Sequence, residues 1–394
     1  MQHDMEQSQT CKPPPTPQPK MEQAQITKAP EPIPLRDITL LINYERMISD
    51  PRYKNLKLGG STRGDPNMSE GVKMLIPNIW EGEAESVTRR SVHLFAPEEG
   101  EAKIATKNPP ATCELHSFAS EGVKALSLAD RDLIFHETRG QNGCYNATGM
   151  YQDFFALCPK GQEISVQIGN ETPVIIDATH RLIFEYTIHD PKHDIRSVME
   201  NSGYNNKKLW YTSSGAKSGE NHCVMAFLPQ PHPFLQLSSY IKGGEIDLSK
   251  FLIVDMTRLQ YGEASFGTYG ETYFLGPFAK YIESMKHICG DLRLRRVIPK
   301  TTGRVNEPEN QIRVKECARR AWERWENKEK EGWCDYCGRG GELKKCGACK
   351  GRKVWYCCGE HQKKGWKLHK MTCEKAPVLG PKNKVALVSG KSWV

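Results

Sequence analysis

The segment "CDYCGRGGELKKCGACKGRKVWYCCGEHQKKGWKLHKMTC", residues 334–373, decides how the C-terminal part of this chain folds. Two Cys-x-x-Cys pairs stand eight residues apart, and a tight turn in each aims both thiolates at one point. Tetrahedral Zn²⁺ needs four nitrogen or sulfur ligands, so eight candidates make two complete sites without a position for water, which indicates structural zinc. The eight candidates are Cys334, Cys337, Cys346, Cys349, Cys357, His361, His369 and Cys373.

The order of these motifs resembles the MYND-type zinc finger. The resemblance rests on "CDYC", "CGAC", "WYC" and "QKKGWKLHKMTC", covers about 40 of the 394 residues, and says nothing directly about residues 1–330. In the MYND pattern the ligand just before Gln-x3-Trp is a cysteine, whereas this chain has His361. Neutral imidazole is an ordinary zinc ligand, so we expect His361 to take the place of that cysteine.

The doubled cysteine of the segment offers two ligands for one position. Cys357 lies beside Tyr356, as the family places its ligand, and Cys358 falls where the family varies. We therefore expect Cys357 to bind zinc and Cys358 to be a spare thiol. Spacing alone leaves open whether the two sites are consecutive or interleaved. The resemblance implies interleaving, with Cys334, Cys337, Cys357 and His361 on one zinc and Cys346, Cys349, His369 and Cys373 on the other.

Two further residues of the segment point to a binding surface. Gln362 and Trp366 are four residues apart and share one face of the expected helix. An indole offers a flat apolar surface and an amide can bond a peptide backbone. The resemblance implies that these positions line a groove for short proline-containing peptides of partner proteins, and that the chain is an adaptor or regulator, most often of transcription. The alternative is that Trp366 is part of the core of a very small module.

The composition indicates a protein of the nucleus or cytoplasm. No apolar run approaches the roughly 20 residues that span a bilayer, and the N-terminus lacks the apolar segment of a secretory signal, so we expect no membrane partner. In a reducing compartment the clustering of seven of the 14 cysteines within the segment indicates metal rather than disulfides.

The charge suggests a second class of partner. The net charge is +8, and ten Lys and Arg against three Asp and Glu give +7 to residues 334–373 alone. Such clustering permits nucleic-acid binding. The basic residues are mostly lysines without the interleaved aromatic side chains of a base-stacking surface, however, and an acidic face on a protein partner explains the charge equally well.

The rest of the chain predicts an α+β protein with a central mixed or antiparallel sheet. Residues 1–36 are rich in Pro, Gln, Lys and Glu, and we expect a disordered tail. Residues 37–300 read as one globular domain of unknown role. "EISVQIG" (163–169) and "PVIIDATHRLIFEYTI" (173–188) predict a meander of antiparallel strands, "FLIVDM" (251–256) a buried strand, and residues 278–289 a helix ended by Gly290.

The segment that joins this domain to the cysteines predicts a connecting helix. Within residues 301–332, apolar side chains recur on one face from Val314 to Trp325, Pro308 suits a first turn, and Gly332 ends the pattern. We expect the apolar stripe to pack on the domain or on the finger at 333–375. A flexible tail is expected at 376–394.

We find no strong catalytic motif and expect no enzyme. "ENHCVM" (220–225) and "KGGEIDL" (242–248) superficially match motifs of SET-domain lysine methyltransferases, which also carry MYND fingers, but key residues are absent and the order is reversed. "HDPKHD" (189–194) reads as a polar turn rather than a metal site. A Cys-His nucleophilic site around His136 and Cys144 stays open, because such partners need only be adjacent in space.

Overall fold

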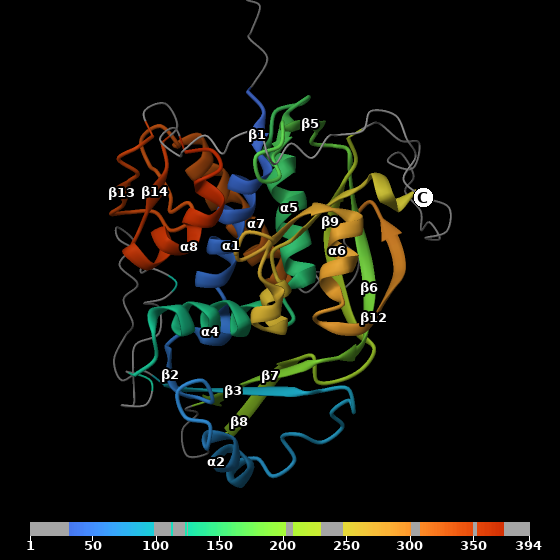
Figure 1. Ribbon diagram of the computed structural model, residues 1–394, viewed down its shortest axis with the longest axis vertical. Helices are drawn as coiled ribbons and strands as arrows, with labels where there is room; N and C mark the ends of the chain where they lie inside the picture. Colours follow the sequence, from blue (N-terminus) through green and yellow to red (C-terminus); the bar gives the residue numbers. More distant parts are fainter. Residues whose placement is uncertain are drawn as a thin grey trace, which may run out of the picture. The chain divides into compact units, whose positions relative to one another are not determined.

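The computed structural model describes residues 31–97, 112, 123, 125–201, 208–229, 247–300, 308–349 and 353–373 (Figure 1). The first 30 residues of the predicted tail, and the predicted C-terminal tail, lie outside this range. Strand β1 (Ile33–Pro34) and helix α1 (Leu35–Ile48) begin within the last residues of the predicted N-terminal tail. Ile33 and Leu35 are buried, and burial of their side chains fixes this stretch in place.

The largest sheet has five antiparallel strands of mostly apolar residues. They are β6 (Arg181–Pro191), β9 (Glu220–Phe227), β10 (Leu252–Asp255), β11 (Phe274–Pro277) and β12 (Cys289–Ile298). Their order across the sheet is β11-β10-β9-β6-β12. The predicted buried strand at 251–256 is confirmed as β10. The predicted helix is α6 (Phe278–Met285), which is shorter than expected because Cys289 already belongs to β12.

Helix α5 (Cys144–Leu157) packs on one face of this sheet, with two further helices packed against α5, and α6 covers the other face. The two helices packed against α5 are α1 and α7 (Pro308–Glu326). The predicted stripe of α7 is buried from Val314 to Ala321 in the same core as α1, α5 and the inner face of β9, and the rest of it, to Trp325, is partly buried against that core. Phe154 of α5 meets Trp322 of α7 edge to face at 5.5 Å. The predicted connecting helix is therefore present, although it ends at Glu326 rather than at Gly332, and its apolar stripe packs on α1 and α5.

A second sheet has four strands and a helix on each face. Its strands are β2 (Leu56–Ser61), β3 (Arg89–Pro97), β7 (His193–Asn201) and β8 (Lys208–Ser214). The order is β2-β3-β7-β8, with β3 and β7 parallel. Helix α4 (Leu128–Gly140) packs through Ile134 on Phe95, and α2 (Met68–Leu75) packs through Val72 on Val92. Because β6 leads directly into β7, one continuous chain segment joins the two main sheets.

The predicted meander is only partly correct. Strands β4 (Glu163–Val166) and β5 (Val174–Asp177) form an antiparallel hairpin, and β1 adds to β4 in parallel. The next strand, β6, does not continue this sheet but pairs with β9 and β12. Both faces of β6 are apolar, with Ile183 in one core and Phe184 in the other, so it belongs in the centre of a larger sheet.

The C-terminal finger consists of β13 (Lys344–Lys345), β14 (Trp355–Tyr356) and α8 (Gly359–His369). Figure 1 shows these elements in red beside α1 and α7. The Arg36 guanidinium of α1 donates to both carboxylate oxygens of Asp335 at 2.8 Å, and Arg324 of α7 donates to the carbonyl of Gly338.

Among the described helices, none is long and apolar enough to cross a membrane.

Candidate metal centre

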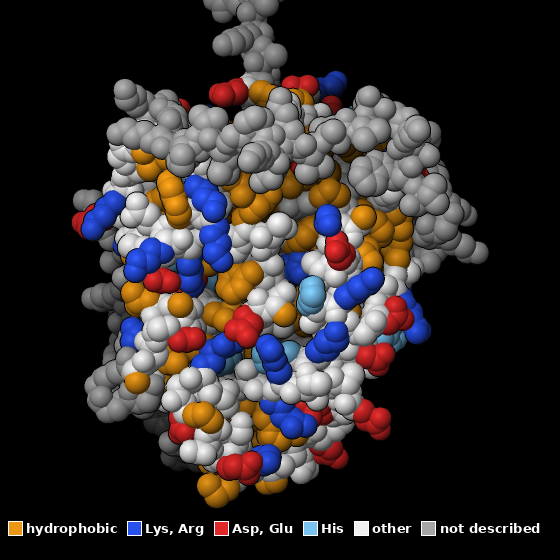
Figure 2. Space-filling view, in the orientation of Figure 1, with side chains coloured by type: hydrophobic (Ala, Val, Ile, Leu, Met, Phe, Trp, Pro, Cys, Tyr) orange, Lys and Arg blue, Asp and Glu red, His pale blue; other side chains and the backbone are white. Residues whose placement is uncertain are grey.

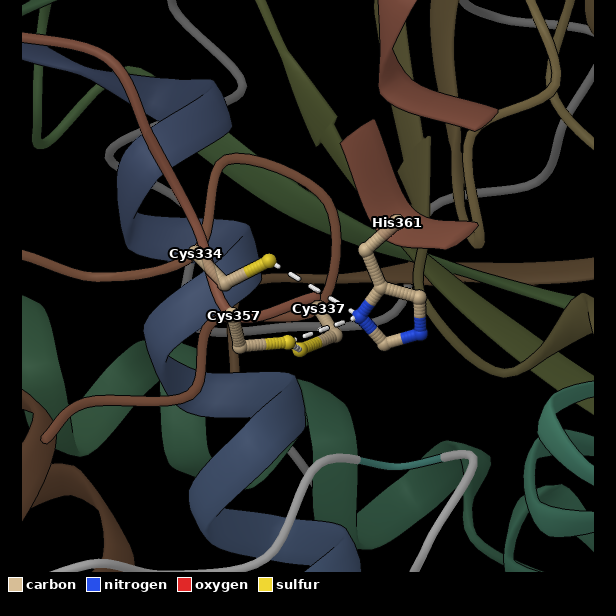
Figure 3. Close-up of side chains that lie close together, drawn as sticks. All are labelled: Cys334, Cys337, Cys357 and His361. Atoms are coloured by element: carbon tan, nitrogen blue, oxygen red, sulfur yellow. Dashed lines mark hydrogen bonds between the residues drawn. The ribbon is translucent and has the colours of Figure 1, made fainter. Parts of the chain in front are cut away.

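Two groups of Cys and His side chains meet inside the finger, and we number them site 1 and site 2. In site 1, two thiols belong to the loop after α7, one thiol to the residue after β14, and the imidazole to the first turn of α8. Figure 3 shows the three sulfurs on one side of the His361 ring, with one ring nitrogen facing them and the other pointing away. Site 1 consists of Cys334, Cys337, Cys357 and His361, and site 2 of Cys346, Cys349, His369 and Cys373.

The distances in site 1 match a tetrahedral zinc ion. Zn–S bonds of about 2.3 Å place two sulfurs about 3.8 Å apart, and a Zn–N bond of about 2.0 Å places the nitrogen about 3.5 Å from each sulfur. The sulfurs of Cys337 and Cys357 lie 3.8 Å apart. Nδ1 of His361 lies 3.1 Å from Cys357 Sγ and 3.8 Å from Cys334 Sγ.

Site 2 has the same donor set and similar spacing. The sulfurs of Cys349 and Cys373 lie 3.8 Å apart. Nε2 of His369 lies 3.5 Å from Cys349 Sγ and 3.3 Å from Cys346 Sγ. The two sites therefore differ in the nitrogen that they use, which is Nδ1 in site 1 and Nε2 in site 2.

The surroundings of both sites fit structural zinc. Seven of the eight ligand residues are buried, all except the half-buried Cys357. The buried cysteines share a core with Val354 and Tyr356 that has few other apolar side chains. Four protein donors fill each tetrahedron, so neither site leaves a position for water or substrate. The two clusters fit two structural zinc ions, whose binding free energy replaces the apolar core that so small a module lacks.

The structure gives the two adjacent cysteines different places. Cys357 faces site 1, whereas Cys358 lies at the N-terminal cap of α8. The sulfur of Cys358 accepts a hydrogen bond from the backbone N–H of His361 at 3.4 Å. Its thiol therefore satisfies one of the free N–H groups at the start of α8, the helix that carries His361 and His369.

Comparison with known proteins agrees with this geometry. The family model of the MYND finger matches residues 334–373. This segment is a MYND finger. Egl nine homolog 1 of Mus musculus is 45% identical over 51 residues, which is 12% of this chain and 12% of that protein. Egl nine homolog 1 of Homo sapiens is 43% identical over 42 residues, which is 11% of this chain and 9% of that protein.

The similarity to these relatives covers only the finger segment. The chain thus spans about a tenth of the length of the curated relatives that it matches. No solved structure matches this chain at the same level of significance.

The two residues predicted to bind partners lie on the surface of α8. Gln362 is exposed, and Trp366 is 43% exposed. The Trp366 ring meets the ring of the ligand His369 edge to face at 5.6 Å. One edge of the indole therefore rests on site 2 while much of its surface faces solvent.

The other sequence candidates do not form a metal site. His189 of β6 hydrogen-bonds Ser218 at 3.1 Å, and His193 of β7 hydrogen-bonds Ser91 at 2.9 Å. Each imidazole thus has its own hydroxyl partner, and the two belong to different sheets. The fragment at 220–225 is strand β9, and residues 242–246 lie outside the described part of the chain.

The structure pairs Cys144 with a different histidine from the one suggested by the sequence. Cys144 begins α5, and its thiol interacts with His222 of β9, whose Nε2 lies 2.7 Å from Asp255 Oδ2. A hydrogen bond with Cys223 and the neighbouring His222 hold the pKa of the Cys144 thiol well below its usual value. Cys144 is 4% exposed and His222 is fully buried, so this network lies in the core.

Proposed function

We propose that this chain is a non-enzymatic adaptor or regulator of the nucleus or cytoplasm, whose finger binds short proline-containing peptides of partner proteins. The observation that carries the proposal is the exposed pair Gln362 and Trp366 on one face of α8. A half-exposed tryptophan next to an exposed side-chain amide suits an extended peptide, since the indole packs on a proline ring and the amide bonds the peptide backbone.

Within the described part of the chain, the docking of the finger leaves Gln362 and Trp366 exposed. Lys364 and Leu368 are also four residues apart, and they lie on a second face of α8 that meets the rest of the protein. Gln362 and Trp366 are about half a turn from Lys364. The finger can therefore bind a peptide without leaving its place on the protein.

The charge of the finger supports a protein partner with acidic side chains near its prolines. Figure 2 shows Lys and Arg side chains set among Asp, Glu and hydrophobic side chains on one face of the molecule. The charge of the finger is concentrated in lysines, including Lys363 and Lys367 on the exposed side of α8. Such residues attract an acidic peptide and raise its association rate at low salt.

A peptide-binding measurement with zinc analysis tests the proposal. We expect the full chain to bind a synthetic peptide with three consecutive prolines, and Trp366→Ala to weaken this binding by about 2 kcal/mol or more, as for a typical interface tryptophan. The zinc content of the variant should stay at two ions per chain. Isothermal titration calorimetry and metal analysis measure the two quantities.

Trp210→Ala is the matched control, because Trp210 is 36% exposed and lies on β8, outside the finger. It should leave peptide binding unchanged. Loss of zinc together with peptide binding in Trp366→Ala would show that this residue supports the core of the finger instead. Unchanged peptide binding in Trp366→Ala would place the peptide elsewhere.

A further inference from the structure

The histidine in site 1 connects the finger to the rest of the protein. Its Nδ1 faces the sulfurs of Cys334 and Cys357, and its Nε2 lies 3.2 Å from Oδ1 of Asp132. Asp132 belongs to α4 and is 229 residues away in sequence. Both side chains are fully buried. A residue of α4, a helix that packs on the second sheet, therefore contacts the second nitrogen of a metal-ligand imidazole.

The carboxylate of Asp132 is held in place by several donors. Nζ of Lys364, on α8, lies 2.9 Å from Oδ2 of Asp132. The hydroxyl of Thr112 donates to Oδ1. A buried carboxylate without such partners would be costly. Asp132 is thus an acceptor held by contacts from several side chains, and α8 supplies two of them, Lys364 and His361.

We propose that Asp132 is a positioning residue for zinc site 1, so that this site is completed from outside the finger. A metal-ligand histidine usually donates its other ring N–H to a carboxylate, which fixes the tautomer and orients the ring. Here Asp132 keeps the proton on Nε2, leaving Nδ1 with the lone pair that faces the three thiols. The inference rests on the fit of site 1 to zinc and is independent of peptide binding.

The proposal explains what a histidine offers at position 361. A cysteine binds zinc through its single sulfur and has no second polar atom to present to α4. An imidazole has two nitrogens on opposite sides of the ring and can bridge the metal and Asp132. By linkage, docking of the finger then strengthens zinc binding at site 1, and zinc strengthens docking by the same factor.

The test compares Asp132→Asn in two backgrounds of the full chain. In the natural background we expect the zinc affinity of site 1 to fall by about 10- to 100-fold, the usual effect of removing such a partner, while site 2 changes little. Competition with a chromogenic chelator measures affinity. Alkylation of the thiols that become free, mapped by mass spectrometry, identifies the site that empties through Cys334 and Cys337 or through Cys346 and Cys349.

The second background is His361→Cys, which keeps four ligands but removes the nitrogen that meets Asp132. Here Asp132→Asn should change the affinity of site 1 less than twofold. Equal losses in both backgrounds would overturn the proposal, because they would show that Asp132 acts through folding or through Lys364 alone. Asp130→Asn is the matched control, since Asp130 is on the same helix and its side chain bonds Ser127 at the helix start.

Discussion

A buried ion pair links the stability of the central sheet to pH. His222 of β9 lies 2.7 Å from Asp255 of β10, and both are almost completely buried. Burial lowers the pKa of His222, but the charge and hydrogen bond of Asp255 outweigh it and raise that pKa to about 10. The pKa of the Asp255 carboxyl is lowered, because burial is outweighed by the charge of His222. The hydroxyl of Tyr281 also donates to this carboxylate.

The direction of the pH effect follows from the His222 shift. An unfolded histidine has a pKa of about 6.5, so the pair stabilises the fold fully below that pH and loses this contribution as pH rises toward 10. We expect Asp255→Asn to destabilise the protein most near pH 6, by a few kcal/mol at most, and less near pH 9.5. Urea unfolding at constant free zinc measures the difference from the natural protein at each pH.

Asp247→Asn serves as the control for this experiment, since Asp247 is an exposed carboxylate at a turn before β10. Its effect should be small and constant between pH 6 and 9.5. If Asp255→Asn also gave a constant difference over this range, His222 would not be charged in the folded state, and the pair would be a neutral hydrogen bond.

At the level of single elements, the packing of helix α8 in the finger requires a glycine at position 365. A Cβ added at Gly365 would lie 2.8 Å from Cε1 of Tyr356, which is buried in the core of the finger. In an exposed helix, Gly→Ala would stabilise by about 1 kcal/mol. Here we expect Gly365→Ala to destabilise the finger by about 1 to 3 kcal/mol, because the methyl group would overpack that core.

Gly359→Ala is the matched control, as a Cβ at the start of α8 meets no atom within 4 Å. Chelator titrations of the two variants compare the stability of the loaded finger. Equal zinc retention in both would show that the Tyr356 ring can move aside without cost.

Local spacing made some elements predictable from the sequence. The zinc ligands lie within 40 residues, and turns and one short helix bring them together, so the pattern is visible in the chain itself. Helix α7 has an apolar stripe from Val314 to Ala321 and a charged outer face, which is the periodicity that predicts a helix. Strand β10 is an apolar run of β-branched residues.

Other elements have no such signal. Helix α4 buries Asp132, His136 and Glu137, so its inner face does not look apolar in the sequence. Helix α1 is buried nearly all round and includes buried Asn43 and Arg46, so its polar residues do not mark a solvent face. These buried polar side chains interact with residues that are distant in the sequence, and only the tertiary structure brings the two partners together. The contact of Asp132 with the finger was unpredictable for the same reason.

At the scale of the whole molecule, the finger contacts α1, α4 and α7 and is not held by its linker alone. Arg36 of α1 forms a two-pronged ion pair with Asp335, and Asp132 of α4 contacts Lys364 and the ring of His361. Gly338 lies so close to α1 that an added Cβ would be 2.3 Å from the carbonyl oxygen of Leu40. The described residues from Pro32 onward accordingly belong to one compact unit.

This attachment predicts that removing zinc loosens more than the finger. With a strong chelator we expect faster amide hydrogen exchange within residues 334–373, and also in α1 around Leu40 and in the last turns of α7, whose Arg324 bonds the Gly338 carbonyl. Strands β6 and β9 have no contact with the zinc sites and should keep their protection, since exchange reports local opening.

Returning zinc should restore the slow exchange of α1 and α7, which controls for irreversible damage by the chelator. Faster exchange confined to the finger would instead mean that it is a tethered module whose folding is independent of its neighbours.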